Sequence, residues 1–233
     1  MAGADGLRAV LIDIDGTLID SNEAHARAWA DILRPRGFED VTWQRVVPLV
    51  GMGGDKLLPE LTGLDAESKR AKQLFEERAA HFLSTYAPTL RVFPGARELL
   101  EALRARGLAR VVATSAGEDE LDALLGRAGI ADLLTDVTGK DDAGGKSKPE
   151  PDVIEAALEK AGVSAREAVM LGDTPYDIEA AARAGVPTIA VRTGGWGDGP
   201  LGGAVAIYAD VAELLANLDD ALTLASRRVR AAG

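Results

Sequence analysis

The chain has 233 residues, with 26 Lys or Arg, 37 Asp or Glu and no Cys, so its formal net charge is −11. A hydrophobic fraction of 47% predicts a folded globular protein. The acidic balance argues against nucleic acid and anionic membranes as partners, because both attract basic surfaces. The absence of cysteine excludes disulfides, thiolate metal sites and a cysteine nucleophile.

The first expected strand lies close to the N-terminus, at residues 9–14, where an apolar run leads into acidic residues. The few residues before it lack the pattern of a secretory signal, and no apolar stretch approaches the roughly 18 residues of a membrane span. We therefore expect a cytoplasmic protein.

The next segment, residues 20–92, contains helical patterns and no convincing buried strand. Helices are expected at residues 23–33 and 41–50, and an apolar stripe runs from residue 74 to residue 86. Trp29 and Phe75 are expected in the interior of this segment. We interpret residues 20–92 as an all-helical insert, because Pro94-Gly95 then marks a turn back to the rest of the fold.

From residue 108 onward, short apolar runs alternate with helical patterns. Strands are expected at residues 108–113, 133–137, 168–171, 188–191 and 205–208, with a last helix at 211–224. The alternation predicts an α/β fold with a Rossmann-like parallel sheet and helices on both faces. The predicted division is a core of residues 1–19 and 93–233 with an insert of residues 20–92.

Polar side chains follow four of the expected strands. Parallel sheets bind ligands at the carboxyl ends of their strands, so these side chains should share one site. They are Asp13, Asp15, Thr114, Ser115, Lys148, Asp173 and Asp177.

Several carboxylates at one site repel one another unless a cation lies among them. An oxygen-rich set of this kind suits Mg²⁺, which commonly bridges carboxylates to a substrate phosphate. Lys148 and the hydroxyls could then bind phosphoryl oxygens. A carboxylate can also attack phosphorus and form an aspartyl-phosphate. The sequence thus predicts a magnesium site that serves phosphoryl chemistry.

The same residues resemble the four motifs of the haloacid dehalogenase-like superfamily. The matching runs are Asp13-x-Asp15-Gly-Thr, Thr114-Ser115, Lys148-Pro-x-Pro and Gly172-Asp173-x-x-x-Asp177. The resemblance spans residues 8–192. The insert is similar to the helical cap of the subgroup that contains phosphoglycolate phosphatases and beta-phosphoglucomutases. The resemblance implies a phosphoric monoester hydrolase.

The resemblance also implies a role for each motif residue. Asp13 would be the nucleophile and a metal ligand. Asp15 would be the acid and base, offering its backbone carbonyl to the metal. Thr114 and Ser115 would hold phosphoryl oxygens and Lys148 would offset their charge. Asp173 and Asp177 would complete the metal site.

Three residues of the insert are candidates for contact with substrate. His25 occupies an Asp-Ser-x-x-x-His arrangement whose histidine often faces the active site in related proteins. Gly51 would let backbone approach a ligand, and Lys56 could meet an anion. In the mutase subgroup, an arginine that grips a second phosphate matches Gly54 here, and this departure favours hydrolysis.

The leading hypothesis is a Mg²⁺-dependent phosphatase acting on a small phosphorylated metabolite of the phosphoglycolate or sugar-phosphate type, as a monomer or homodimer. Two alternatives remain open. One is phosphoryl transfer between positions of a sugar phosphate, as in beta-phosphoglucomutase. The other is a phosphate-binding module without catalytic activity.

Overall fold

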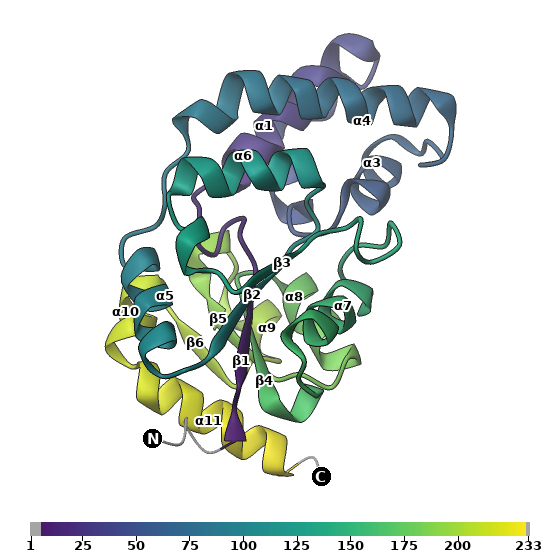
Figure 1. Cartoon of the computed structure of the whole chain (residues 1–233). Helices are drawn as coiled ribbons and strands as arrows, with labels where there is room; N and C mark the ends of the chain where they lie inside the picture. The colour runs from purple at the N-terminus through teal and green to yellow at the C-terminus, as the bar shows by residue number, and fades with distance from the viewer. Residues whose placement is uncertain (1–5, 232–233) are drawn as a thin grey trace.

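A six-stranded parallel sheet forms the centre of the computed structural model, which describes residues 6–231 (Figure 1). The order of its strands is β3-β2-β1-β4-β5-β6, which confirms the predicted α/β fold. The strands are β1 (Ala9–Ile12), β2 (Ala109–Ala113), β3 (Asp136–Thr138), β4 (Ala168–Gly172), β5 (Thr188–Val191) and β6 (Ala206–Tyr208).

Helices cover both faces of the sheet because successive strand side chains point to opposite sides. Val10 and Ile12 of β1 join one apolar cluster, and Ala9 and Leu11 join another. The first cluster packs against α5 (Ala96–Ala105), α6 (Glu118–Ala128), α10 (Val211–Ala216) and α11 (Leu218–Ala231). The second packs against α7 (Asp152–Ala161) and α8 (Pro175–Arg183), and the short α9 (Asp198–Leu201) lies before β6.

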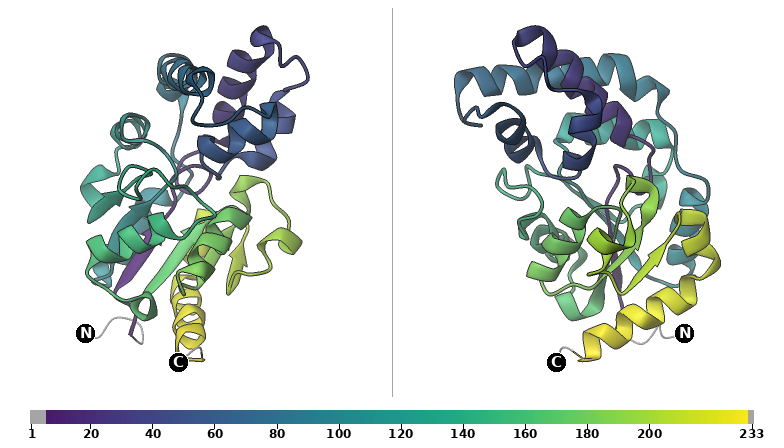
Figure 2. Two further views of the ribbon diagram at one scale, coloured as in Figure 1. Left: turned by 90° about the vertical axis from the view of Figure 1, so that its right-hand side faces the viewer. Right: turned by 180° about the vertical axis from the view of Figure 1, so that it is seen from behind.

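A group of helices from the insert lies above the carboxyl ends of the strands (Figures 1 and 2). They pack around an apolar cluster of their own, which includes Trp29, Leu57 and Leu74. These helices are α1 (Asn22–Leu33), α2 (Trp43–Val46), α3 (Gly54–Thr62) and α4 (Lys69–His81). None of the helices that the structure describes is long and apolar enough to cross a membrane.

The two chain crossings between the insert and the sheet lie side by side. Ile19 forms an isolated bridge with Val92, and the Phe93 amide donates to the Leu18 carbonyl at 2.9 Å. This pairing supports a division near residues 20 and 92, which stays a prediction. Residues 1–5 and 232–233 of the predicted core segments lie outside the described residues.

Three expected elements differ from the structure by more than two residues at one of their ends. The strand expected at residues 133–137 is Asp136–Thr138, because Leu133 is buried in a 3-10 turn before it. The helix expected at 41–50 is only Trp43–Val46, followed by a 3-10 turn in which Pro48 has no amide to donate. The last helix is divided at Asn217 and extends to Ala231.

Candidate active site

Three buried carboxylates meet where β1 and β4 end. Asp13 directly follows β1, and its amide donates to the Leu171 carbonyl at 2.9 Å. Asp173 directly follows β4, and Asp177 lies in the first turn of α8. Each of the three carboxylates has an oxygen within 4.8 Å of the others. The sequence predicted this meeting because the strands of a parallel sheet end at the same edge. The structure adds that β1 and β4 are neighbours.

Lys148 links two of these carboxylates. Its Nζ lies 2.6 Å from Asp13 Oδ1 and 2.6 Å from Asp177 Oδ1, and its side chain is 1% exposed. Burial, with the nearby charges of Asp177 and Asp15, raises the pKa of Asp13 to about 8 although Lys148 opposes this change. Burial, with the nearby charges of Asp177 and Asp13, also raises the pKa of Asp173 well above its usual value.

The donor set fits a divalent cation that prefers oxygen. One lysine faces three buried carboxyl groups, so with all three ionised the pocket would contain more negative than positive charge. Asp173 is already oriented, because Thr17 Oγ1 donates to its Oδ1 at 2.7 Å and Asn22 Nδ2 to its Oδ2 at 3.0 Å. A cation bound among the carboxylates would offset the repulsion that, together with burial, raises the pKa values of Asp13 and Asp173. The Asp15 carboxylate is outside this group, and its carbonyl as a metal ligand stays a prediction.

The turn after β1 requires a glycine at position 16. Gly16 has φ of +75°, a conformation that favours glycine, and a Cβ there would overlap Asn22 Nδ2 and Asp173 Oδ2. The missing side chain therefore allows the turn to pass beside the Asp173 carboxylate.

Gly16→Ala should destabilise the protein more than Gly107→Ala. Gly107 has nearly the same φ, +73°, but nothing lies within 4 Å of a Cβ there. Left-handed strain should cost about 1–2 kcal/mol at either position, and overlap with Asp173 should add about 1–3 kcal/mol at Gly16 alone. Urea unfolding of both variants measures the difference. Equal losses would show that the turn can move away from Asp173.

Asp15 faces the insert rather than the three carboxylates. Its Oδ1 accepts hydrogen bonds from Ser21 Oγ and from His25 Nε2, the latter at 2.8 Å. The guanidinium of Arg78 contacts His25 Nδ1. Because arginine can only donate, Nδ1 accepts and Nε2 carries the proton that His25 donates to Asp15. Burial would raise the pKa of Asp15, but His25, Ser21 and Arg78 outweigh it and lower that pKa.

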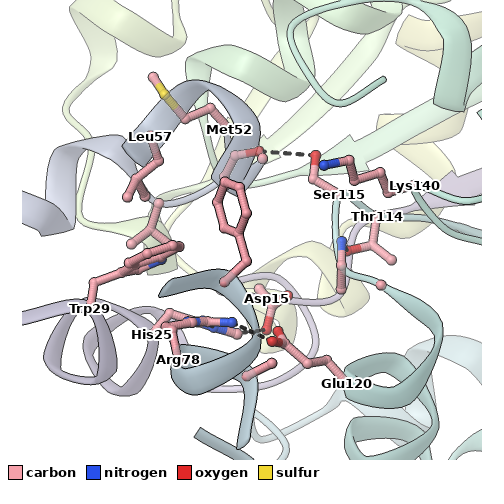
Figure 3. A pocket seen from close by; sticks show the side chains of 18 of the residues that line it. Asp15, His25, Trp29, Met52, Leu57, Arg78, Thr114, Ser115, Glu120 and Lys140 are labelled. Carbon is pink, nitrogen blue, oxygen red and sulfur yellow. Dashed lines mark hydrogen bonds and ion pairs between the residues drawn. The ribbon is translucent and has the colours of Figure 1, made fainter. Parts of the chain in front are cut away.

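A cavity of about 310 Å³ opens beside these residues, between the insert and the sheet (Figure 3). At its sheet end it is lined by Asp13, Asp15, Thr114 and Ser115, so the structure brings four predicted site residues together. His25 and Gly51 line it from the insert. The Gly51 carbonyl accepts a hydrogen bond from Ser115 Oγ at 3.4 Å.

Lys56 does not line this cavity. Its Nζ donates to the Ser147 carbonyl at 2.5 Å and to Ser147 Oγ at 3.2 Å, so it joins α3 to the loop that carries Lys148. Contact between Lys56 and substrate stays a prediction, and the geometry gives Lys56 a place at the contact between insert and sheet.

A family profile described as haloacid dehalogenase-like hydrolase matches residues 10–191. The chain belongs to this family. A phosphoglycolate phosphatase from Rhodospirillum rubrum is 35% identical over 216 residues, which cover 89% of each chain. The crystal structure of a hydrolase from Pseudomonas syringae is 30% identical and superposes with a TM-score of 0.83, covering 91% of this chain and 98% of that one.

A beta-phosphoglucomutase from Clostridium difficile shares the fold of this haloacid dehalogenase-like hydrolase. Its TM-score is 0.79 at 18% identity, and the match covers 93% of this chain and 97% of that one. A likeness at this identity concerns the fold alone.

Sequence reasoning missed three charged residues that line the cavity of this hydrolase, Arg78, Glu120 and Lys140. Arg78 on α4 forms a partly buried ion pair with Glu120 on α6, and both line the cavity. The sequence pattern could have identified Arg78, because it lies on the buried face of α4 with Ala71 and Leu74. An arginine on an apolar helix face requires a partner. The identity of that partner depends on how the insert lies on the sheet, which no spacing in the sequence shows.

Proposed function

We propose that this hydrolase is a Mg²⁺-dependent phosphatase that acts on a small phosphomonoester through a phosphorylated Asp13. The observation that carries the proposal is the position of Asp13 at the end of β1. It lines the cavity beside Thr114 and Ser115, and it belongs to a buried group of three carboxylates bridged by Lys148. The relationship to phosphoglycolate phosphatases supports the same reaction class.

In the proposed reaction, an oxygen of Asp13 attacks phosphorus and the ester P–O bond breaks. Asp15 gives a proton to the departing alkoxide; the approaching phosphate dianion favours protonation of Asp15 because it adds negative charge beside it. Asp15 then takes a proton from water, whose oxygen attacks the aspartyl-phosphate. Inorganic phosphate leaves and the Asp13 carboxylate is restored.

Asp13, Asp173 and Asp177 would hold Mg²⁺, with the backbone carbonyl of Asp15. The ion, when bound, supplies positive charge to the phosphoryl oxygens. Lys148 holds Asp13 in place and offsets its charge as phosphate approaches. Thr114 and Ser115 would donate to phosphoryl oxygens. Residues 20–92 would act as a cap that separates the reaction from bulk water.

Mutase chemistry is the second candidate, and one observation weighs against it. A sugar bisphosphate intermediate needs a binding site for a second phosphate group. Gly54, which matches the arginine position of the mutase subgroup, offers no charge, and a Cβ there would lie 3.1 Å from the Phe75 ring and 3.3 Å from the Trp29 ring. A requirement for a sugar bisphosphate in turnover would select the mutase.

Removal of the metal should abolish activity and lower thermal stability. With Mg²⁺, the protein should release phosphate from members of a panel of small phosphomonoesters, and with EDTA this release should stop. The melting temperature should rise with Mg²⁺ because the ion binds only the folded arrangement of Asp13, Asp173 and Asp177. Asp173→Asn should reduce the shift. Full phosphate release in EDTA would refute the metal-dependent mechanism. No release from any ester by the folded protein would favour a binding module.

A further inference from the structure

A cavity remains between the insert and the sheet although the insert contacts the rest of the fold at several points. Tyr176 donates to the Pro48 carbonyl at 2.7 Å, and Lys140 Nζ lies 3.1 Å from Asp55 Oδ1 on α3. Arg78 and Glu120 form a third contact between the insert and the rest of the fold. The remaining volume of about 310 Å³ lies at the small end of the ~300–1,000 Å³ typical of small-molecule sites. It extends well beyond the phosphoryl end at Asp13.

The permanent positive charges of this cavity are already paired. Among the described residues that line it, two carry such a charge, Arg78 and Lys140. Arg78 pairs with Glu120, whose side chain is 12% exposed, and Lys140 pairs with Asp55. A second anionic group on a substrate would therefore compete with a protein carboxylate for either cation. It would also lie close to Glu120, which repels it.

The wall opposite the phosphoryl end is apolar. Trp29 and Leu57 reach the cavity from α1 and α3, as Figure 3 shows, and Phe75 lines it from α4. The Trp29 and Phe75 rings meet edge to face with centroids 5.8 Å apart. Gly54 lies beside both rings, so its missing side chain leaves their surfaces open to the cavity. An alcohol with an apolar face would bury surface here, and a two-carbon acid would leave the wall uncovered.

We propose that the leaving group of the preferred substrate is an uncharged alcohol with an apolar or aromatic face, which packs against Trp29, Leu57 and Phe75. The Arg78–Glu120 pair then acts as a specificity element that disfavours alcohols bearing a carboxylate or a second phosphate. This inference rests on the proposed phosphatase activity and refines its substrate class. It separates this chain from enzymes that select an anionic leaving group.

The first test compares four alkyl phosphates with the wild-type protein and Mg²⁺: benzyl phosphate, propyl phosphate, phosphoglycolate and para-carboxybenzyl phosphate. We expect kcat/KM to be at least ~10-fold higher for benzyl than for propyl phosphate, because the ring fills the apolar wall. We also expect each carboxylate-bearing ester to be at least ~10-fold poorer than its uncharged counterpart. All four are esters of primary alcohols, so none is an activated aryl ester.

The second test removes the repelling charge. Glu120→Gln should raise kcat/KM for phosphoglycolate relative to propyl phosphate by roughly 5- to 10-fold, because Arg78 becomes available to a carboxylate. Asp119→Asn is the matched control, since Asp119 is an exposed carboxylate in the same first turn of α6. In this control, the ratio of kcat/KM for phosphoglycolate to kcat/KM for propyl phosphate should equal that of the wild type. Phe75→Leu should lower the preference for benzyl over propyl phosphate and leave the effect of the carboxylate unchanged.

The two proposals fail in different ways. If no ester is hydrolysed, or if EDTA leaves hydrolysis intact, the phosphatase mechanism is wrong and the substrate class falls with it. If all four esters are hydrolysed with Mg²⁺ but phosphoglycolate is best, the phosphatase stands and the inference about the leaving group is wrong. An unchanged charge preference in Glu120→Gln would equally remove Glu120 as a specificity element.

Discussion

Replacement of Asp13 by asparagine should lower phosphate release by roughly 10⁴-fold or more, the scale of loss seen when a catalytic nucleophile is removed. The amide keeps the shape of the side chain but cannot form the acyl phosphate. The fold should persist, because Lys148 retains Asp177 as a partner at 2.6 Å. Burial and two neighbouring carboxylates raise the pKa of Asp13, so its charge is not needed for stability. Phosphate release and urea unfolding measure the two effects separately.

Asp20→Asn is a suitable control, since Asp20 is an exposed carboxylate shortly after the same turn. Its activity and stability should match those of the wild type. If Asp13→Asn retained more than a tenth of the activity while folded, Asp13 would not be the nucleophile. If the variant lost both activity and folding, the Lys148 pair with Asp13 would be more important for stability than the geometry indicates.

The sequence predicted the sheet and the grouping of polar side chains at one edge of it for one reason. Neighbouring parallel strands end at the same edge, so residues that follow β1, β2 and β4 must meet there. The position of each apolar run was enough to predict that Asp13, Thr114 and Asp173 lie at this edge. Short strands at the edge of the sheet were harder to predict, as with Asp136–Thr138, where Leu133 is buried in a turn instead of a strand.

The far end of the cavity could not be predicted in the same way. Its character depends on contacts between the insert and the sheet, such as Arg78 with Glu120, 42 positions apart in the chain. The sequence predicts that Trp29 and Phe75 lie in the interior of the insert, and in the structure Trp29 belongs to its apolar cluster and Phe75 packs against it. They also line the cavity, because a ring at the edge of the apolar cluster has one face against the cluster and the other against the cavity. The spacing of apolar residues identifies the buried face of a helix, but it does not distinguish a side chain in the interior of the insert from one that also lines a cavity.

Lys148→Met should cost about 3–5 kcal/mol of the free energy of unfolding in the absence of Mg²⁺, because breaking a buried ion pair leaves its partner without compensation. Here the change leaves both Asp13 and Asp177 without their shared lysine, inside a site that also contains Asp173. Methionine keeps most of the apolar stem, so lost packing contributes little. Activity should fall as well, since the charge that offsets phosphate at Asp13 is gone.

Lys146→Met is the matched control, because Lys146 lies two residues earlier in the same loop and forms an exposed ion pair with Asp152 at 2.7 Å. It should unfold as the wild type does. Mg²⁺ should stabilise Lys148→Met more than it stabilises the wild type, since a divalent cation replaces the missing counter-charge among the three carboxylates. A Lys148→Met protein as stable as Lys146→Met without Mg²⁺ would show that the fold does not need Lys148. Lys148 would then serve the reaction alone.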